Sequence, residues 1–135
     1  VMYSPLQMAA DLPKNYMRFP DAFQFIKDVA LDWDKSVYLE AEPGEYVTIA
    51  RKEKGTDNWF VGNSNGYDKR EALVDFKFLD KNRKYTATIY RDSKDADYAK
   101  NPQSYKIEKI EVSSKSKIKI PTVAAGGFAI SILPN

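Results

Sequence analysis

The sequence contains no cysteine and no histidine. These absences exclude disulfide frameworks, zinc sites built from Cys and His, thiol nucleophiles and every catalytic triad that depends on an imidazole. Oxygen atoms are then the only ligands that the chain could offer to a metal ion.

A net charge of one sign is also nearly absent. Lys and Arg together number 21 and Asp and Glu 19, which gives a formal net charge of +2. This value is too small to indicate a phosphate-binding surface, so we do not expect a nucleic-acid partner. No apolar run approaches the roughly 20 residues that cross a bilayer, and the first residues lack the basic and apolar regions of a signal peptide. We therefore expect no targeting signal in these residues and no membrane partner.

What the chain does have is enough apolar material for a core. Its 135 residues match the size of one ordinary domain, and 43% of them are hydrophobic, including 2 Trp, 9 Tyr and 7 Phe. We therefore expect a folded domain rather than a disordered chain.

Residues 1–34 show helical periodicity. Ser4 can cap a helix that begins at Pro5, and Pro13 is expected to end it. Asp21 is the candidate cap of a second helix, because an apolar stripe with helical spacing follows it. The stripe consists of Ala22, Phe25, Ile26 and Val29. Both helices are too short to be stable alone, so each is expected to dock on a larger surface.

From residue 35 the hydrophobic period changes to two, with turn signals every 8 to 14 residues. This pattern is typical of antiparallel sandwiches and barrels. The expected strands are 37–41, 46–51, 59–62, 73–79, 85–91, 105–112, 115–120 and 128–133. Eight strands can each bury their apolar face if they form two sheets that pack against one another. The predicted fold is therefore mainly β: a helical segment over residues 1–34, and a two-sheet antiparallel β-sandwich of about eight strands over residues 35–135.

The alternation also predicts which side chains form the core and how the strands connect. The expected core residues are Val47, Ile49, Val74, Phe76, Phe78, Ile118 and Ile120. Asn65 and Gly66 favour a hairpin turn with positive φ. A bulge near Glu108 and Lys109 would bring four apolar side chains of one strand to the core face. Those side chains are Tyr105, Ile107, Ile110 and Val112.

No pair of carboxylates stands out as catalytic. The 19 acidic residues lie mainly in turns and on the solvent side of strands, so we expect solvated surface acids and no catalytic residue. Residues 92–97 form the one acidic cluster, but the cluster lacks the spacing of an EF-hand loop. Asp side chains that cap backbone amides are the favoured interpretation of this cluster, with calcium as the alternative. We expect no cofactor-binding or metal-binding residue in the chain.

Several aromatic residues could stack on sugar rings. Trp33, Trp59 and Tyr98 are the principal candidates, together with Tyr67 and Tyr90, because an aromatic face offers an apolar platform with a polar rim. Aromatic residues within strands more often fill a core. Both interpretations stay open at this stage.

Several short stretches of the sequence resemble a known protein family, which the hydrophobic periodicity alone could not indicate. Residues 2–11 (MYSPLQMAAD) and 19–26 (FPDAFQFI) resemble the junction between the catalytic barrel and the C-terminal domain in glycoside hydrolase family 97. The stretches 46–51 (YVTIAR), 58–62 (NWFVG) and 90–92 (YRD) then look like the C-terminal domain of that family, in the same order. The resemblance covers essentially the whole chain.

The resemblance implies that this segment belongs to a calcium-dependent α-glucosidase or α-galactosidase of Bacteroides-like bacteria, in the periplasm. The family's catalytic carboxylates and calcium ligands would lie upstream of Val1, in a (β/α)₈ barrel, and residues 2–12 would be the end of a late barrel helix. The expected task of the domain is to brace its own barrel, with subunit contacts in a homo-oligomer as a further role. An accessory carbohydrate-binding module is the alternative function, and an unrelated adhesin-like sandwich is a third.

Overall fold

The computed structural model describes residues 1–4, 8 and 10–135. Two α-helices precede the strands, α1 (Pro13–Tyr16) and α2 (Pro20–Asp28), and a short 3-10 helix, η1 (Phe76–Phe78), lies within the β region. The strands are β1 (Trp33–Glu42), β2 (Tyr46–Glu53), β3 (Trp59–Asn65), β4 (Arg70–Asp75), β5 (Tyr85–Asp92), β6 (Tyr105–Val112), β7 (Lys117–Thr122) and β8 (Gly127–Pro134). None of the helices in the described part of the chain has the length and apolar character needed to cross a membrane.

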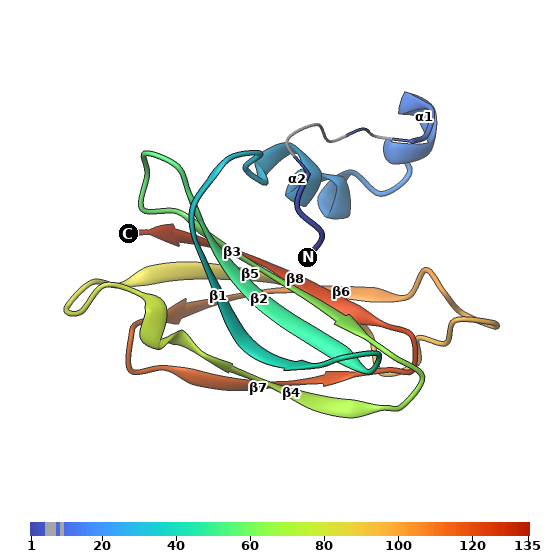
Figure 1. The fold of residues 1–135 in the computed structure, drawn as a ribbon. Coiled ribbons are helices and arrows are strands. Elements are labelled where there is room, and N and C mark those ends of the chain that lie inside the picture. The colour runs from blue at the N-terminus through green and yellow to red at the C-terminus, as the bar shows by residue number, and fades with distance from the viewer. Residues whose placement is uncertain (5–7, 9) are drawn as a thin grey trace.

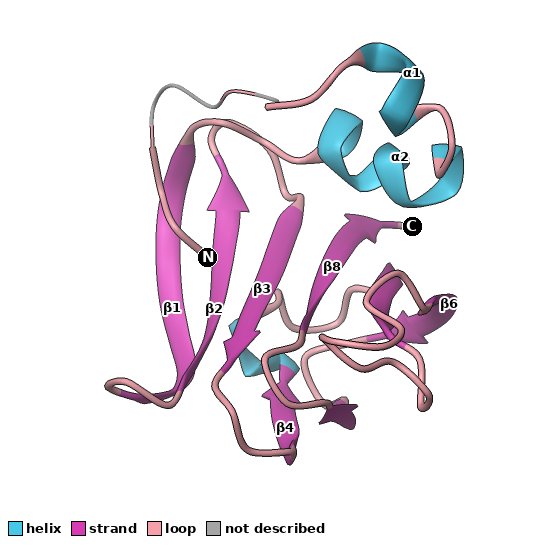
Figure 2. Ribbon diagram, turned by 90° about the vertical axis from the view of Figure 1, so that its right-hand side faces the viewer, coloured by secondary structure: helices cyan, strands magenta, loops and turns pink. Residues whose placement is uncertain are grey.

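The eight strands form two antiparallel sheets. The larger sheet has the order β1-β2-β3-β8-β5-β6, and β4 pairs with β7 in a separate two-stranded ribbon. Figure 1 shows three layers, with the helices above the large sheet and the ribbon below it. Figure 2 shows the same helices above one end of the strands after a quarter turn. The predicted two-sheet sandwich with short N-terminal helices is confirmed.

The main core lies between the large sheet and the ribbon. Val74 and Ile120 enter it from the ribbon, Ile130 enters it from β8, and all three are at most 2% exposed. Phe76 is fully buried, while Phe78 and Ile118 are half-buried and pack against the same cluster. Five of the seven residues that were expected in the core thus lie in this cluster or pack against it.

Strand β2 departs from the expected core. Ala50 belongs to the main core, whereas Val47 is half-buried and lies outside it. Ile49 is 2% exposed, but it pairs with Gly62 on the opposite face from Ala50. Ile49 is therefore buried as expected, although on the other face of the sheet, whereas the prediction that Val47 belongs to the core is wrong. Its cause is physical: this strand is covered on both faces, so apolar residues occur at both parities.

Helix α2 covers the outer face of the large sheet. The ring of Phe25 lies 6.2 Å from the ring of Phe60 and 5.4 Å from that of Tyr90, both at edge-to-face angles. The hydroxyl of Tyr105 donates a hydrogen bond of 2.7 Å to Asp21. Edge-to-face aromatic pairs add to the stabilisation from burial alone. The short helix is thus held by the sheet on which it docks, as its length requires.

The same docking explains why the expected bulge in β6 is absent. The register between β5 and β6 runs without a shift from Tyr85 opposite Val112 to Asp92 opposite Tyr105. Ile110 and Val112 therefore face the main core, while Tyr105 and Ile107 point to the opposite face. The apolar residues change parity because each half of the strand is covered by a different layer.

Both helices begin at a proline. Pro13 is the first residue of α1, so the prediction that it ends a helix is wrong. The expected helix start at Pro5 lies outside the described residues. Pro20 is likewise the first residue of α2, and Asp21 lies in the first turn, where its carboxylate accepts a 2.9 Å hydrogen bond from the amide of Ala22. Proline suits this position because its missing N–H has no intrahelical partner to lose.

The stretch around Gly66 crosses between the sheets and is not a hairpin. β3 belongs to the large sheet and β4 to the ribbon, and the side-chain amide of Asn65 bridges the crossing with bonds to the carbonyls of Asp68 and Val123. Gly66 does not have positive φ, but a Cβ there would lie 2.7 Å from the carbonyl oxygen of Glu45. Glycine is needed for close approach, so the predicted hairpin turn is wrong.

Candidate interaction surfaces

The carboxylates of the described residues are mostly engaged with other groups of the fold. Among the described residues, no three acidic side chains are arranged so that they could bind a metal ion together. Asp57, for example, pairs with Lys52 at 3.0 Å and with Arg83 at 2.7 Å. Hydrogen bonds from these two cations lower the pKa of the Asp57 carboxyl. Such an acid is held ionised by its structural partners, which differs from the raised pKa of a general acid.

The acidic loop that follows β5 is stabilised by its own side chains. The Asp97 carboxylate accepts hydrogen bonds from the amides of Ala99 and Lys100 at 3.0 and 2.9 Å, and Asp92 accepts one from Gly127. Asp95 accepts hydrogen bonds from two serine hydroxyls and the amide of an asparagine, and these bonds lower its pKa. The interpretation of this cluster as capping carboxylates is confirmed.

The three candidate sugar-stacking residues do not lie together. Trp59 is 3% exposed and its ring lies 4.7 Å from that of Phe78, within the main core. Trp33 is half-buried and packs edge-to-face on Phe60, on the outer face of the sheet. Tyr98 is 64% exposed, in the loop between β5 and β6 at the opposite end of the strands from Trp59. Only Tyr98 of these three offers an open ring face.

The other two aromatic candidates also differ in exposure. Tyr90 is half-buried under Phe25, and burial raises the pKa of its hydroxyl. Tyr67 is 84% exposed, directly after the crossing between the sheets. Tyr67 could therefore contact a partner, whereas Tyr90 is part of the contact between α2 and the sheet.

The N-terminal segment exposes many apolar side chains. More than half of the large hydrophobic residues that are exposed in the described part of the chain lie within residues 1–31. They are Val1, Met2, Tyr3, Met8, Leu12, Met17, Ile26 and Leu31. The three methionines, all those of the chain, are 91%, 81% and 63% exposed. We call these side chains the apolar N-terminal surface. Clustered exposed apolar groups mark interaction sites.

A hollow of about 500 Å³ lies within this surface. Its described lining includes Met2, Tyr3, Ile26, Leu31, Trp33 and Arg51. The guanidinium of Arg51 lies 5.6 Å from the centre of the Tyr3 ring. Val1 rests on Gly62, where a Cβ would come within 2.9 Å of the Val1 side chain.

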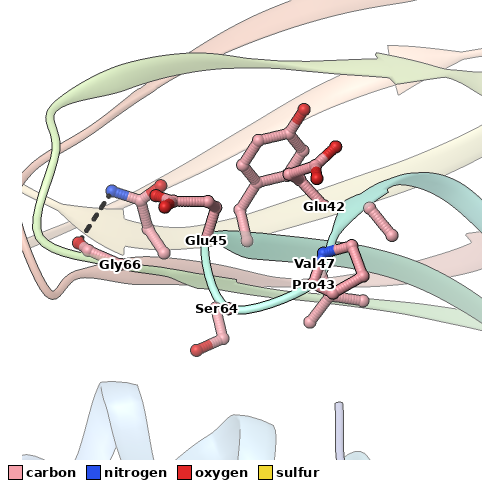
Figure 3. A pocket seen from close by; sticks show the side chains of 10 residues that line it. Glu42, Pro43, Glu45, Val47, Ser64 and Gly66 are labelled. Atoms are coloured by element: carbon pink, nitrogen blue, oxygen red, sulfur yellow. Dashed lines mark hydrogen bonds between the residues drawn. The ribbon is translucent and has the colours of Figure 1, made fainter.

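A second hollow, of about 360 Å³, lies beside the turn between β1 and β2 (Figure 3). Glu42, Pro43 and Glu45 line it from the turn (Figure 3). The amide of Gly66 donates a 2.6 Å hydrogen bond to the carbonyl of Glu45. Behind it, the ring of Tyr46 packs against the guanidinium of Arg70 at 3.5 Å. Sequence reasoning recognised this turn from its Pro-Gly pair but not the acidic side chains around it.

The sequence profile of the family described as "Glycosyl-hydrolase 97 C-terminal, oligomerisation" matches residues 32–133. Among curated proteins, a retaining alpha-galactosidase of Bacteroides thetaiotaomicron is 37% identical over 132 residues, which are 98% of this chain and 19% of that protein. A probable retaining alpha-galactosidase of Streptomyces bingchenggensis is 27% identical over 96% of this chain and 19% of its own length. The chain thus spans about a fifth of the length of these relatives.

Solved structures agree with these matches. A glycoside hydrolase family 97 enzyme from Pseudoalteromonas sp. strain K8, solved in complex with acarbose, superposes with a TM-score of 0.97 at 39% identity, over 100% of this chain and 21% of that chain. A beta-arabinopyranosidase superposes with a TM-score of 0.73 at 23% identity, which shows a shared fold alone.

Proposed function

The chain belongs to the family of glycosyl-hydrolase 97 C-terminal, oligomerisation domains, and from this membership we propose that it serves a larger α-glycosidase without catalysing the reaction itself. The parent enzyme would be an α-galactosidase or an α-glucosidase, since the similar proteins include a retaining alpha-galactosidase and family 97 enzymes. Its acid and base or nucleophile would lie on the loops of the barrel. The engaged carboxylates of this chain support that division of labour.

The apolar N-terminal surface carries the proposal that the domain braces its barrel. It adjoins the N-terminal residues, through which a C-terminal domain would connect to the remaining four-fifths of its parent. Residues 1–34 would then combine the end of the barrel with the linker to the sandwich. Burying apolar side chains stabilises by about 25 cal/mol per Å² of surface removed from water. A barrel seated here would therefore gain stability from the domain, and the domain from the barrel.

Charge substitutions in the parent enzyme test this arrangement. Leu31→Glu places a carboxylate in the apolar N-terminal surface, and Leu73→Glu places one on the ribbon, at a leucine of similar exposure, 53% against 42%. We expect Leu31→Glu to lower the melting temperature and the glycosidase activity of the parent, while Leu73→Glu leaves both near wild type. In the 135-residue chain alone both substitutions should be nearly neutral. Equal effects of the two substitutions in the parent would contradict the bracing role.

A carbohydrate-binding role is the second candidate, and one observation favours it. Tyr98 presents an open ring on a loop that is rigidified by its own hydrogen bonds. Calorimetric titration with maltooligosaccharides at millimolar concentration tests this role. A saturable isotherm that Tyr98→Ala abolishes would support it, and the absence of heat and of a thermal shift would contradict it. Trp33 and Trp59 would contribute little, because each is packed against a phenylalanine ring.

Two further proposals concern the parent and rest on the family resemblance. Calcium would be held by the barrel, so chelation should lower the activity of the parent and leave the melting temperature of this chain unchanged. The parent would reside in the periplasm, which cell fractionation of the source organism tests. An equal loss of stability in this chain on chelation would contradict the first proposal, and activity confined to the cytoplasmic fraction would contradict the second.

A further inference from the structure

Four connections between strands meet at one end of the sandwich. They are residues 43–45, 66–69, 93–104 and 123–126, and Figure 1 shows them together at the right-hand end. Backbone hydrogen bonds tie three of them to one another, from Gly66 to Glu45 and from Ala125 to Gly66, both at 2.6 Å. We call these connections and the residues that flank them the loop end. It adjoins the apolar N-terminal surface at Gln103, which lines a hollow together with Ile26, but its other connections lie outside that surface.

The loop end holds the carboxylates that the fold leaves without a partner. Glu42, Glu45 and Asp68 accept no side-chain hydrogen bond and form no ion pair with the described residues. Every other Asp and Glu of the chain does one or both, as the contacts of the described residues show. Sixteen of the 19 acids are thus engaged with the described residues. Of the three exceptions, Glu45 and Asp68 lie in two adjoining connections, and Glu42 is the last residue of β1.

A basic hollow lies beside this acidic patch. It has a volume of about 310 Å³, and the charged residues in its lining are Lys69, Arg70, Arg91, Lys94 and one acid, Asp92, whose carboxylate accepts a hydrogen bond from Gly127. Glu40 holds Arg70 and Glu108 holds Arg91, each at 2.7 Å. Lys69 and Lys94 have no ion pair or hydrogen bond to the side chains that the structure describes. The loop end therefore carries unpaired charge of both signs, in two neighbouring regions.

Two exposed tyrosines belong to the same end. Tyr67 is 84% exposed and adjoins Asp68, and Tyr98 is 64% exposed in the loop that begins near Lys94. Tyrosine is enriched among the residues that carry binding energy in interfaces, because it supplies a large, stiff contact area with a polar tip. Apolar contact and charge are thus both available at the loop end.

We propose that the loop end pairs with the loop end of a second copy of this chain about a two-fold axis. In such an interface the same patch occurs on both subunits, so it must be complementary to itself. The acidic patch of one copy (Glu42, Glu45, Asp68) would face the basic hollow of the other (Lys69, Lys94), and the reverse contact would form at the same time. This inference rests on the oligomerisation role of the family and names the surface that performs it.

The geometry allows the two docking events to coexist. The apolar N-terminal surface lies over the outer face of the large sheet, and the loop end lies beyond the tips of the strands. One domain could then brace its barrel with the first surface and pair with a second copy through the other. Complementary charges set the partner and the rate of encounter more than the affinity, so salt should weaken the pairing.

Reciprocal charge reversal tests the proposal on the 135-residue chain. One variant carries Glu42→Lys and Glu45→Lys, and the other carries Lys69→Glu and Lys94→Glu. Each alone would bring like charges together, so we expect its dimer dissociation constant at low salt to rise roughly tenfold or more. An equimolar mixture of the two should form a heterodimer at near wild-type affinity. Sedimentation velocity with one variant fluorescently labelled measures both quantities.

A matched control uses unpaired lysines at the other end of the strands. Lys81→Glu with Lys115→Glu makes the same change in net charge as the second variant, and it should leave the dissociation constant unchanged. All six positions are exposed, so thermal unfolding should show wild-type stability for each variant. Calcium added at millimolar concentration should not change the association, because opposite charges of a second copy, and not a cation, cover the acidic patch.

The outcomes separate this inference from the function on which it rests. If the wild-type chain associates and both charge variants associate equally well, or if the mixture fails to restore pairing, the loop end is the wrong surface and the oligomerisation role stands. If the wild-type chain stays monomeric at low salt over the whole accessible concentration range, both the surface and the role in self-association are wrong. Association that depends on calcium would contradict the proposal, because it would mean that a cation binds the acidic patch in place of the second copy.

Discussion

Arg70 of the ribbon donates a 2.7 Å hydrogen bond to Glu40 of β1, and this ion pair closes the edge of the sandwich between its two sheets. Both side chains are about one-fifth exposed. The hydroxyl of Thr48 donates a further hydrogen bond to the same carboxylate, at 3.1 Å. The ring of Tyr46 covers the guanidinium at 3.5 Å. Two sheets that share no strand pairing at this edge are thus joined by one polar cluster.

We expect Arg70→Met to lower the free energy of unfolding by about 2 kcal/mol, because it leaves a half-buried carboxylate without its main hydrogen-bond donor. Lys119→Met is the matched control. It removes an ion pair with Glu71 whose two side chains are both more than half exposed, so its cost should be clearly smaller than that of Arg70→Met. Urea denaturation measures both values. Equal costs would mean that the pair between the sheets contributes no more than a surface pair.

The same cluster predicts a dependence on pH. Burial opposes ionisation of Glu40, but hydrogen bonds from Arg70, the Leu73 amide and Thr48 outweigh it and lower the pKa of the carboxyl. A carboxyl whose pKa is lower in the folded state stabilises the fold above its unfolded pKa, and this contribution is lost as pH falls through the folded pKa. The difference in stability between wild type and Glu40→Gln should therefore be largest near neutral pH and shrink in acid. A difference that grows on acidification would contradict the assignment.

Gly66, at the crossing between the sheets, should tolerate a side chain poorly. A Cβ at this position would lie 2.7 Å from a backbone oxygen of the neighbouring turn, which cannot rotate away. We expect Gly66→Ala to cost roughly 2 kcal/mol, within the range for overpacked sites. Gly55→Ala is the control, since it meets open space and incurs only the strain of its positive φ, about 1 kcal/mol. Thermal unfolding of the two variants ranks the effects, and a milder effect at Gly66 would contradict the close approach.

Trp59 and Tyr98 should respond to truncation in opposite ways. Trp59→Ala removes a ring from the main core and should cost about 3 kcal/mol or more. Tyr98→Ala removes a ring that is mostly in solvent and should leave the free energy of unfolding nearly unchanged. Chemical denaturation of both variants measures this contrast. Wild-type stability of Trp59→Ala would show that its ring is available to a ligand after all.

The fold class could be predicted because turn residues and alternating side chains report local geometry. Val74, Phe76 and Ile120 were assigned to the core correctly, although η1 replaces the end of the expected strand at Phe76. The pattern failed where a third layer intervenes. Ile49 and Tyr105 looked like ordinary strand residues, and nothing local indicates that α2 and the N-terminal residues cover the outer face of the sheet.

The candidate surfaces were harder to predict than the fold. Residue types alone suggested Trp33, Trp59 and Tyr98, yet side-chain exposure depends on long-range packing that a single sequence does not reveal. The three unpaired acids of the loop end lie in or directly beside two connections that are more than 20 residues apart in the chain. Only the folded arrangement brings them together and leaves their carboxylates without an ion pair to the described residues.

The central claim is that this chain supports catalysis without performing it. The most direct measurement is the hydrolysis of nitrophenyl α-galactoside and α-glucoside by the purified 135-residue chain, beside the parent enzyme at equal molar concentration. We expect turnover by the parent and none above background by the chain. Turnover by the chain that a single carboxylate substitution within it abolishes would contradict the claim.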